Sequence, residues 1–493
     1  MLVQTCSGLV RGAQLDGAFV FRGIPYAAPP TGELRFKAPA PARPWQGIRH
    51  CDHFGPIAPQ KGDPNGFLPE LPQSEDCLTL NVWTTGPAEV LKPVLFYIHG
   101  GGFVSGKGAD CDGRRYAAED GLVYVSINYR LGALGFLYLG ELLGEAFATS
   151  GNTGMLDIVA ALQWVRRNIA AFGGDPSRVT AIGNSAGAKC AATLYTMEAA
   201  RGLFAGVIAQ SGATQSIRDR STANVTAQRL LDELGLARAE AHQLLELPAE
   251  RLIEAQSAIG FDTSRSLHMF GPVADGRVIP DDPLGSMNSV SGGSMPPLLI
   301  GSNEDEAAIF IQGDPLLAPP SPDVADRLFG ANAPIVWVSY RRYSESMPSA
   351  EAWRRTLSEH LYTIGAMQFA AAVSDAGAKA WVYRLRCGGS LGAIHGYESS
   401  LINGLHDAGM TANPEDPFAV APEYYPLARS MRAAWVAFAK TGNPNVAQLP
   451  EWPTYGANRS TMVLDRQCRV GEDLPEPAGA AVTHQVWRIS ACS

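Results

Sequence analysis

The feature that most limits how this chain can fold is an alternation of short apolar runs with helical segments, beginning near residue 78. The apolar runs are rich in β-branched and aromatic residues and are bounded by Gly or Pro, which is typical of strands. They read LTLNVWT, PVLFYIHG, LVYVSINYR, RVTAIGNSAG, GVIAQSG, PLLIGSNEDE and KAWVYRL. Between them, residues 154–169 have apolar positions at helical spacing. The alternation predicts an α/β protein with a mainly parallel, doubly wound sheet, whose chemistry lies beyond the carboxyl ends of the strands.

One large domain explains this pattern better than several small ones. The 493 residues contain no internal repeat and no low-complexity linker, and helical blocks at residues 222–257, 314–376 and 431–442 interrupt the series. An apolar share of 46% excludes disorder, and 52 Gly with 35 Pro indicate many turns. We therefore expect residues 1–493 to form a single α/β domain with helical insertions.

Charge and hydropathy exclude two classes of function. Lys and Arg number 39 against 48 Asp and Glu, and the net charge of −9 argues against binding to nucleic acid. No run reaches the ~18 to 20 apolar residues of a membrane span, and the first residues lack the pattern of a signal peptide. The compartment stays open: periplasmic or secreted if a signal peptide has been removed, and cytoplasmic otherwise.

A serine at the end of one strand has the setting of a catalytic nucleophile. GNSAG at residues 183–187 matches G-x-S-x-G, the sharp turn that lifts a serine above a sheet, but GGSLG at residues 388–392 matches too. Ser185 follows a strand-like run and precedes an alanine-rich segment that can be helical, whereas no clean helix start follows Ser390. The turn requires an acid and a histidine later in the chain, and the histidines after Ser390 are His395, His406 and His484. We therefore expect Ser185 to be the nucleophile.

A glycine-rich loop supplies the second element of a hydrolase site. HGGGF at residues 99–103 follows the run PVLFYI and matches the loop whose backbone N–H groups receive a developing negative charge. Glycine suits this loop because the amides must point inward and the substrate must approach closely. Together with the serine turn further along the chain, the loop predicts acyl transfer through a serine.

Together these segments resemble the type B carboxylesterase family of α/β-hydrolases. The similarity spans nearly the whole chain through FRGIPYAAPPTGELRFKAP, SEDCLTLNVW, YIHGGGF, NYRLGALGF, GNTGMLDIVAALQWVRRNIAAFGGDP, QSGA, GSNEDEAAIF, GAIHGYE, AFAKTGNPN and WPTY. The resemblance implies an α/β-hydrolase fold with helical insertions that form a cap around the gorge. It implies hydrolysis of a small-molecule carboxylic ester by a monomer or small homo-oligomer, and it implies neither a cofactor nor a metal.

The resemblance also assigns the acid and the base of a catalytic triad. The family's glutamate falls on Glu306 in the stretch NEDEA, where alanine replaces the usual following glycine, so Glu304 and Asp305 stay open as alternatives. The family's histidine, in G-x-x-H-x-x-E, falls on His395, with His406 as its competitor.

The expected mechanism is that of a serine hydrolase. Ser185 Oγ attacks the ester carbonyl, His395 takes and returns the proton, and Glu306 orients the imidazole while an acyl-enzyme forms. The resemblance implies three backbone N–H groups as oxyanion donors, those of Gly101, Gly102 and Ala186.

Further contacts are implied by family position alone. One structural ion pair would join Arg130 to Asp157, and a second would join Arg35 to Glu75. Ser211, in the stretch QSG, would be a supporting hydroxyl near the histidine, although a plain strand-end serine is an equal alternative.

Two cysteines, Cys51 and Cys77, are spaced like the family's first disulfide. If they are paired, the chain matures in oxidising surroundings. The other six cysteines show no CxxC spacing, which favours buried free thiols for most of them.

Two positions bear on the substrate. Asn184 replaces the glutamate usual before the serine, and Arg218 stands where cholinesterases carry an acyl-pocket aromatic residue. We hypothesise that Arg218 meets a carboxylate on the acyl part of the ester, the simpler alternative being a solvated loop arginine. A specialised esterase for anionic, polycarboxylate (toxin-like) or long-chain esters is thus the second enzymatic interpretation. A catalytically silent binding module on the same fold is the rival from another class, but such proteins lose the serine or its partners.

Overall fold

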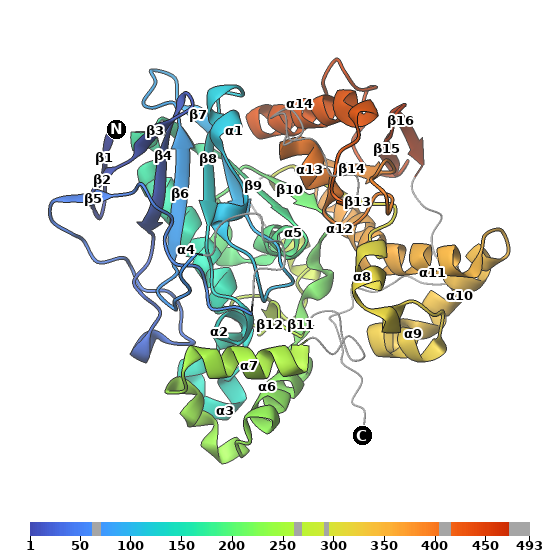
Figure 1. The fold of residues 1–493 in the computed structure, drawn as a ribbon, viewed down its shortest axis with the longest axis horizontal. Coiled ribbons are helices and arrows are strands. Elements are labelled where there is room, and N and C mark those ends of the chain that lie inside the picture. Colours follow the sequence, from blue (N-terminus) through green and yellow to red (C-terminus); the bar gives the residue numbers. More distant parts are fainter. Residues whose placement is uncertain (62–70, 261–268, 290–294, 404–415, 473–493) are drawn as a thin grey trace. The chain divides into compact units, whose positions relative to one another are not determined.

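The computed structural model describes residues 1–61, 71–260, 269–289, 295–403 and 416–472 (Figure 1). Within these ranges the chain forms two compact units. The first comprises the described residues of 1–206, 216–260 and 269–283, and the second comprises those of 207–215 and 284–472. Each unit contains parallel strands accompanied by helices.

The first unit is built on a mixed sheet. Its strands lie in the order β9 (Gly174–Asn184), β7 (Lys92–Ile98), β8 (Val123–Ile127), β6 (Thr79–Thr84), β4 (Ala18–Pro25) and β3 (Ala13–Leu15). β9, β7 and β8 are parallel, and each pair from β8 outward is antiparallel. Every residue of β8 is buried, as expected of a strand that is covered on both faces.

Two helices of this unit follow directly from the sequence pattern. α4 (Thr153–Asn168) and α5 (Ala186–Thr193) both contact β9, and α5 also contacts β7. α4 buries apolar residues three or four positions apart, among them Met155, Ile158, Leu162 and Val165. α5 is buried throughout, which explains its run of small residues.

A second helical layer of this unit contains α6 (Arg220–Leu234) and α7 (Ala249–Gly260), which pack on each other (Figure 1). The Asp219 carboxylate caps α6 by accepting the Thr222 N–H. The unit's shorter elements are α1 (Arg114–Ala118), α2 (Gly132–Phe136), α3 (Gly140–Leu143), β1 (Leu2–Thr5), β2 (Gly8–Arg11), β5 (Ile48–His50), β11 (Arg218–Asp219) and β12 (Val273–Ala274).

The second unit carries parallel strands with one antiparallel edge. Its strands lie in the order β10 (Gly206–Gln210), β13 (Leu298–Asn303), β14 (Ala380–Leu385), β15 (Ser460–Leu464) and β16 (Arg469–Glu472). The first four are parallel and β16 is antiparallel to β15. β13 and β14 are buried along their whole length, and α12 (Ile364–Asp375) packs on both.

The other helices of the second unit form two groups. α13 (Tyr397–Asn403) packs on α14 (Tyr425–Thr441). The second group is α8 (Ala308–Gly313), α9 (Pro322–Phe329), α10 (Ala333–Ser344), α11 (Ser349–Ser358) and a π-helical turn, Glu359–Thr363. This group has its own apolar core around Trp353, whose indole N–H donates to the Leu317 carbonyl at 2.9 Å.

The predicted strands are confirmed as β6, β7, β8, β9, β10, β13 and β14, and the helix at residues 154–169 as α4. The helical blocks are confirmed too, although 222–257 and 314–376 each divide into several helices. The N-terminal strands and β15 and β16 were not predicted. No helix among the described residues is long and apolar enough to cross a membrane.

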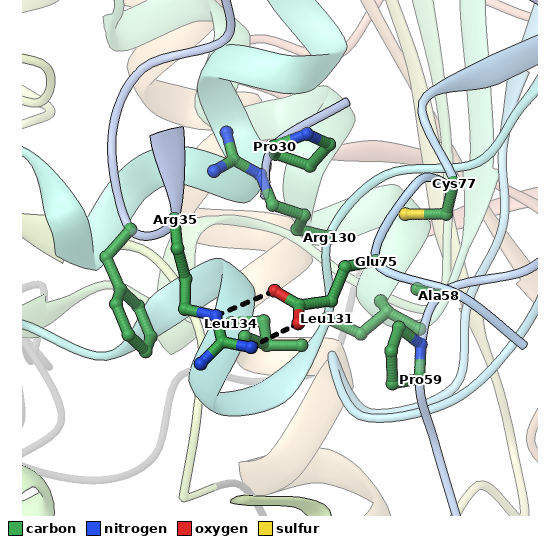
Figure 2. Close-up of a pocket in the computed structure, with 10 residues that line it drawn as sticks. Pro30, Arg35, Ala58, Pro59, Glu75, Cys77, Arg130, Leu131 and Leu134 are labelled. Carbon is green, nitrogen blue, oxygen red and sulfur yellow. Dashed lines mark hydrogen bonds and ion pairs between the residues drawn. The ribbon is translucent and has the colours of Figure 1, made fainter. Parts of the chain in front are cut away.

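Both implied ion pairs are confirmed within the first unit. Arg35, Glu75 and Arg130 line a small pocket, in which Figure 2 shows the Arg35–Glu75 pair. The Arg35 guanidinium binds both oxygens of Glu75, and its Nη1 donates to three carbonyls near the end of a 3₁₀ helix, those of Leu244, Leu245 and Leu247. Arg130 forms a two-pronged bond to Asp157 at 2.8 and 2.7 Å, with both side chains buried. Arg130 therefore joins its loop to α4, and Arg35 joins its loop to the segment that directly precedes α7.

The proposed Cys51–Cys77 disulfide is wrong, since both residues are free buried thiols. Backbone bonds hold Cys51 against two strands, with its N–H donating to Arg11 and its carbonyl accepting from Arg22. Cys77 lines the pocket beside Arg130. Burial raises the pKa of Cys51 to about 11 and raises that of Cys77 as well, so both thiols are protonated packing groups at neutral pH.

Candidate active site

The strand-to-helix turn at Ser185 has the strained geometry expected of a nucleophile. β9 ends at Asn184 and α5 begins at Ala186, and Ser185 between them has φ 57° and ψ −123°. A non-glycine residue at positive φ is uncommon and is found where the surrounding structure enforces it.

The two glycines that flank Ser185 allow the close backbone packing that holds it in this conformation. A Cβ on Gly187 would lie 2.0 Å from the Ile98 carbonyl oxygen, and one on Gly183 would lie 2.3 Å from the Gly187 carbonyl carbon. The turn therefore packs backbone against backbone, and only glycine fits at either position.

The predicted oxyanion loop lies against this turn. A Cβ on Gly100 would come within 2.8 Å of the Asn184 carbonyl oxygen and 3.3 Å of Ser185 Cβ. Gly101 and Gly102 have φ 104° and 61°, which opens conformations that other residues rarely adopt. The loop and the serine of the first unit are thus adjacent, as the sequence predicts.

His99 holds the start of this loop, a role that the motif did not reveal. Its Nδ1–H donates to the Gly100 carbonyl at 2.9 Å, and because C=O and N–H of a trans peptide point in opposite directions, the Gly101 N–H faces away from His99. The ring stacks on Tyr129 at 4.4 Å, whose hydroxyl donates to the His99 carbonyl. Burial lowers the pKa of His99 to about 4, so the ring is neutral at physiological pH.

In the second unit, the predicted acid and base meet. His395 Nδ1–H donates to Glu306 Oε2 at 2.6 Å, and Glu306 Oε1 accepts the Asn303 N–H at 2.8 Å. Glu306 is fully buried, while the His395 side chain is 10% exposed. The ring lies 4.5 Å from Tyr362 and 5.1 Å from Phe310, centre to centre. His395 Nε2 makes no hydrogen bond among the described residues, which leaves it available for proton transfer.

Ser211 contacts a second buried carboxylate rather than the imidazole. Its hydroxyl donates to Glu398 Oε1 at 2.6 Å, and the Asn303 side-chain amide donates to Glu398 Oε2 and to the Ile394 carbonyl. Burial, followed by the neighbouring Glu306 charge, raises the pKa of Glu398 to about 7. Asn303 therefore joins both carboxylates, a link that no local motif could reveal.

The competing assignments have other surroundings. Glu304 and Asp305 both pair with arginines. Ser390 is exposed in a tight turn with no strand leading into it, unlike Ser185. His406 and His484 lie outside the described residues.

Arg218 is buried rather than solvated. It lies in β11 with its side chain over Gly271, where an added Cβ would come within 2.6 Å of the guanidinium and 3.1 Å of the Phe103 ring. Phe103 follows the oxyanion loop glycines directly. Burial lowers the pKa of Arg218 to about 9, which keeps it cationic at neutral pH. The first unit thus has a buried cation beside its oxyanion loop.

Comparison with known proteins gives one consistent result. The sequence model described as Carboxylesterase family matches residues 1–477. The para-nitrobenzyl esterase of Bacillus subtilis (strain 168) is 34% identical over 484 residues, covering 96% of each protein. Phenmedipham hydrolase of Pseudarthrobacter oxydans is 33% identical over 509 residues, covering 98% of each. Among solved structures, the carboxylesterase EST55 of Geobacillus stearothermophilus has a TM-score of 0.84 at 37% identity, over 96% of this chain and 98% of that one.

Proposed function

Since the chain belongs to the carboxylesterase family and hydrolyses carboxylic esters, we propose that it does so through Ser185, His395 and Glu306. The observation that carries this assignment is the 2.6 Å bond from His395 Nδ1–H to Glu306, because it fixes the imidazole with Nε2 directed away from the acid. The strained turn at Ser185 supports the other half of the triad. We also propose that residues 1–493 act as one catalytic domain, alone or as a small homo-oligomer.

Acylation proceeds by general base catalysis. Ser185 Oγ attacks the ester carbonyl carbon while His395 Nε2 accepts the hydroxyl proton, and Glu306 stabilises the imidazolium. Collapse of the tetrahedral intermediate breaks the bond to the alcohol oxygen, which receives that proton from His395. Water then attacks the acyl-serine through the same base, and the carboxylic acid leaves.

The oxyanion is stabilised by backbone N–H groups. The donors are those of Gly101, Gly102 and Ala186, and one such donor typically contributes ~3 kcal/mol to the transition state. Two features support this role. The neutral His99 orients the peptide between Gly100 and Gly101, and the Ala186 N–H is one of the unsatisfied donors at the start of α5.

Ser211 and Glu398 influence the triad through the charge of Glu398, without contact to the substrate. The hydrogen bonds from Ser211 and Asn303 fix the Glu398 carboxyl next to Glu306. With its pKa raised to about 7, Glu398 is largely protonated in mildly acidic solution, and the imidazolium then faces the single charge of Glu306.

The triad is tested by replacing the serine. Ser185→Ala should reduce hydrolysis of p-nitrophenyl acetate by at least about 10⁴-fold. Ser390→Ala is the matched control, because it alters the exposed serine of the other G-x-S-x-G match and should retain full activity. An organophosphate should label Ser185, as read by peptide mass spectrometry. A Ser185→Ala protein with wild-type activity would overturn the assignment.

A narrower substrate class is favoured by Arg218. We propose that its guanidinium binds a carboxylate on the acyl part of the ester, since it is a buried cation that lies against Gly271, as does the Phe103 ring that follows the oxyanion loop. A hydrogen bond to a charged group contributes about 1.5–3 kcal/mol, which corresponds to roughly 10- to 150-fold in kcat/KM. General or long-chain esters are the alternative.

Matched substrates test this proposal. Arg218→Met should lower kcat/KM for a p-nitrophenyl hemisuccinate at least about tenfold, while leaving p-nitrophenyl butyrate nearly unchanged. Arg220→Met is the control, because that neighbouring arginine is half exposed and pairs with Asp281 at 3.4 Å. An unchanged ratio between the two esters would refute the anionic preference, and a rising rate with acyl length would favour long-chain esters.

A further inference from the structure

The three consecutive acids after β13 have three separate tasks. Glu306 bonds His395, as described above. Asp305 Oδ1 lies 3.0 Å from Arg354 Nε, and Glu304 Oε1 lies 3.5 Å from Arg355 Nη1. The two arginines are neighbours on α11, so one helix holds two of the three acids.

Asp305 also binds the segment that carries the histidine. Its N–H donates to the Ala393 carbonyl at 2.9 Å, and its carboxylate oxygen Oδ2 accepts the Ala393 N–H at 3.2 Å. Gly392 lies against the same oxygen, because a Cβ there would come within 2.2 Å of Oδ2, and its φ is 86°. The Asp305 carboxylate therefore contacts Arg354 on one side and Gly392 and Ala393, just before His395, on the other.

The next residue of that segment is held as well. The Asn303 side-chain amide donates to the Ile394 carbonyl at 2.7 Å. Residues 392–394, which directly precede His395, are thus held by the acid loop, that is, by Asn303 and the three acids that follow it. These bonds act on the two residues directly before His395, so they help to set the position of the imidazole relative to Glu306.

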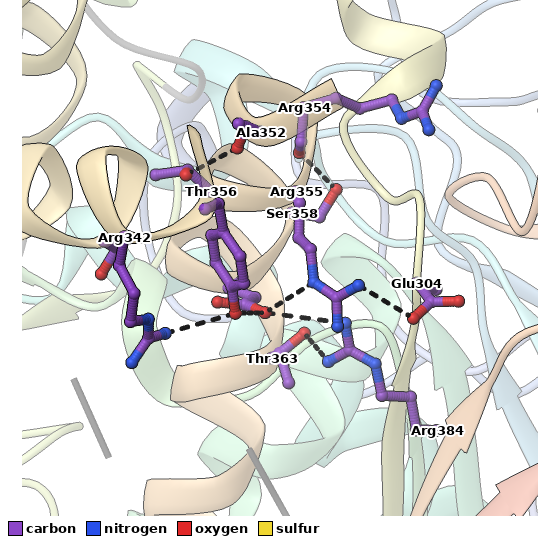
Figure 3. Close-up of polar contacts among 12 residues, drawn as sticks. Glu304, Arg342, Ala352, Arg354, Arg355, Thr356, Ser358, Thr363 and Arg384 are labelled. Carbon is purple, nitrogen blue, oxygen red and sulfur yellow. Dashed lines mark hydrogen bonds and ion pairs between the residues drawn. The ribbon is translucent and has the colours of Figure 1, made fainter. Parts of the chain in front are cut away.

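Arg355 also contacts a second carboxylate, on the π-helical turn (Figure 3). Its Nε lies 3.4 Å from Glu359, a buried carboxylate on the π-helical turn that also accepts the Tyr343 hydroxyl at 2.5 Å. Arg384, almost fully buried on β14, lies 4.0 Å from the same carboxylate. In Figure 3 the Arg355 guanidinium extends from α11 toward Glu304. These contacts tie Arg355, and with it α11, to Glu304 on one side and to Glu359 on the other.

We propose that Asp305 is a positioning residue for catalysis, which Arg354 orients and which in turn sets the place of the His395 imidazole. The proposal rests on the roles given above to Glu306 and His395. Asp305 does not touch the substrate; it acts through the backbone of Ala393. Losing it leaves the triad side chains present and displaces the base, and a displacement of about 1 Å lowers turnover by up to about 100-fold.

The experiment compares graded changes at the two positions. Asp305→Ala should lower kcat about 10- to 100-fold with KM within about twofold, because substrate binding is untouched. Asp305→Asn keeps an acceptor for the Ala393 N–H and should lose less. Arg354→Gln should lower kcat about two- to fivefold, since this pair is partly exposed, and Arg354→Lys should restore at least half of that loss. Arg341→Gln, an exposed arginine on α10, is the control.

A double-variant cycle separates positioning from general destabilisation. If Arg354 acts through Asp305, Arg354→Gln should have no further effect on kcat in the Asp305→Ala background. Should Asp305→Ala fail to fold, the Arg354→Gln and Arg354→Lys pair decides, because that side chain is 38% exposed. Wild-type kcat in Arg354→Gln, or equal loss in the glutamine and lysine variants, would overturn the proposal.

Glu306→Gln is measured beside these variants. If it is inactive while the Asp305 variants keep wild-type kcat, only the positioning role is refuted. If Glu306→Gln itself is fully active, the triad assignment is refuted instead.

Discussion

Glu306 has a geometry in which every oxygen has one task. One oxygen accepts from the Asn303 backbone and the other from the His395 imidazole, so the carboxylate cannot rotate. Glu306→Gln keeps the shape but presents an amide to the imidazole, which favours the wrong tautomer. We expect kcat for p-nitrophenyl acetate to fall about 10³- to 10⁴-fold with little change in KM. Glu351→Gln on the exposed face of α11 should be neutral, and a loss below tenfold would argue against Glu306 as the acid.

Glu398 should make stability depend on pH. Its pKa is raised from 4.5 to about 7 in the folded protein, so below pH 4.5 it is neutral in both states and imposes no penalty. Between pH 4.5 and about 7 the unfolded chain ionises first, and stability falls as the pH rises. Glu398→Gln removes this dependence, so its thermal midpoint relative to wild type should increase from pH 5 to pH 8. A constant difference across that range would contradict the raised pKa.

Residues whose role is local could be predicted from the chain itself, whereas long-range pairs such as Glu306 with His395 and Arg130 with Asp157 were predicted only through the family resemblance. Ser185 and the loop glycines were predictable because a sharp turn leaves its own signature in neighbouring residues. Asn303 was missed because its amide acts on Ile394 and Glu398, which are distant in the chain. The burial of Arg218 was missed for the same reason.

The tight packing of the turn between β9 and α5 predicts that its glycines are essential for stability. Gly187→Ala should destabilise the protein by more than about 3 kcal/mol or prevent folding, because the new methyl would overlap the Ile98 carbonyl of β7. Gly456→Ala is the matched control, since no atom lies within 4 Å of its added Cβ. Chemical denaturation measures both, and similar stabilities would show that the turn can relax.

The strands were predictable where they are buried on both faces. β7 and β8 read as nearly continuous apolar runs because all of β8 and most of β7 after Lys92 is buried. β1, β2 and β3 are three or four residues long with exposed positions, so they show too few apolar residues to be recognised. The π-helical turn at Glu359–Thr363 has no sequence signature, since its register depends on the contacts of Glu359.

At the scale of the whole molecule, the free thiols predict indifference to reducing agents. A native disulfide typically contributes about 2–5 kcal/mol, and none is present among the seven described cysteines. Dithiothreitol should therefore leave the thermal midpoint unchanged. Thiol titration in denaturant without reductant should count at least seven reactive cysteines. A lower thermal midpoint in reductant, with two thiols missing from the count, would show instead that Cys51 and Cys77 form a disulfide.

The division of the chain into two units has a consequence for biosynthesis. The serine turn and the oxyanion loop belong to the first unit, and Glu306 and His395 to the second. On the proposed assignment, a ribosome that has just added Ser185 must add roughly 200 more residues before the base exists, which takes about 10–40 s at usual elongation rates. Throughout that interval the nascent chain carries a nucleophile that nothing activates. Esterase activity therefore begins only after His395 has been translated and its unit has folded.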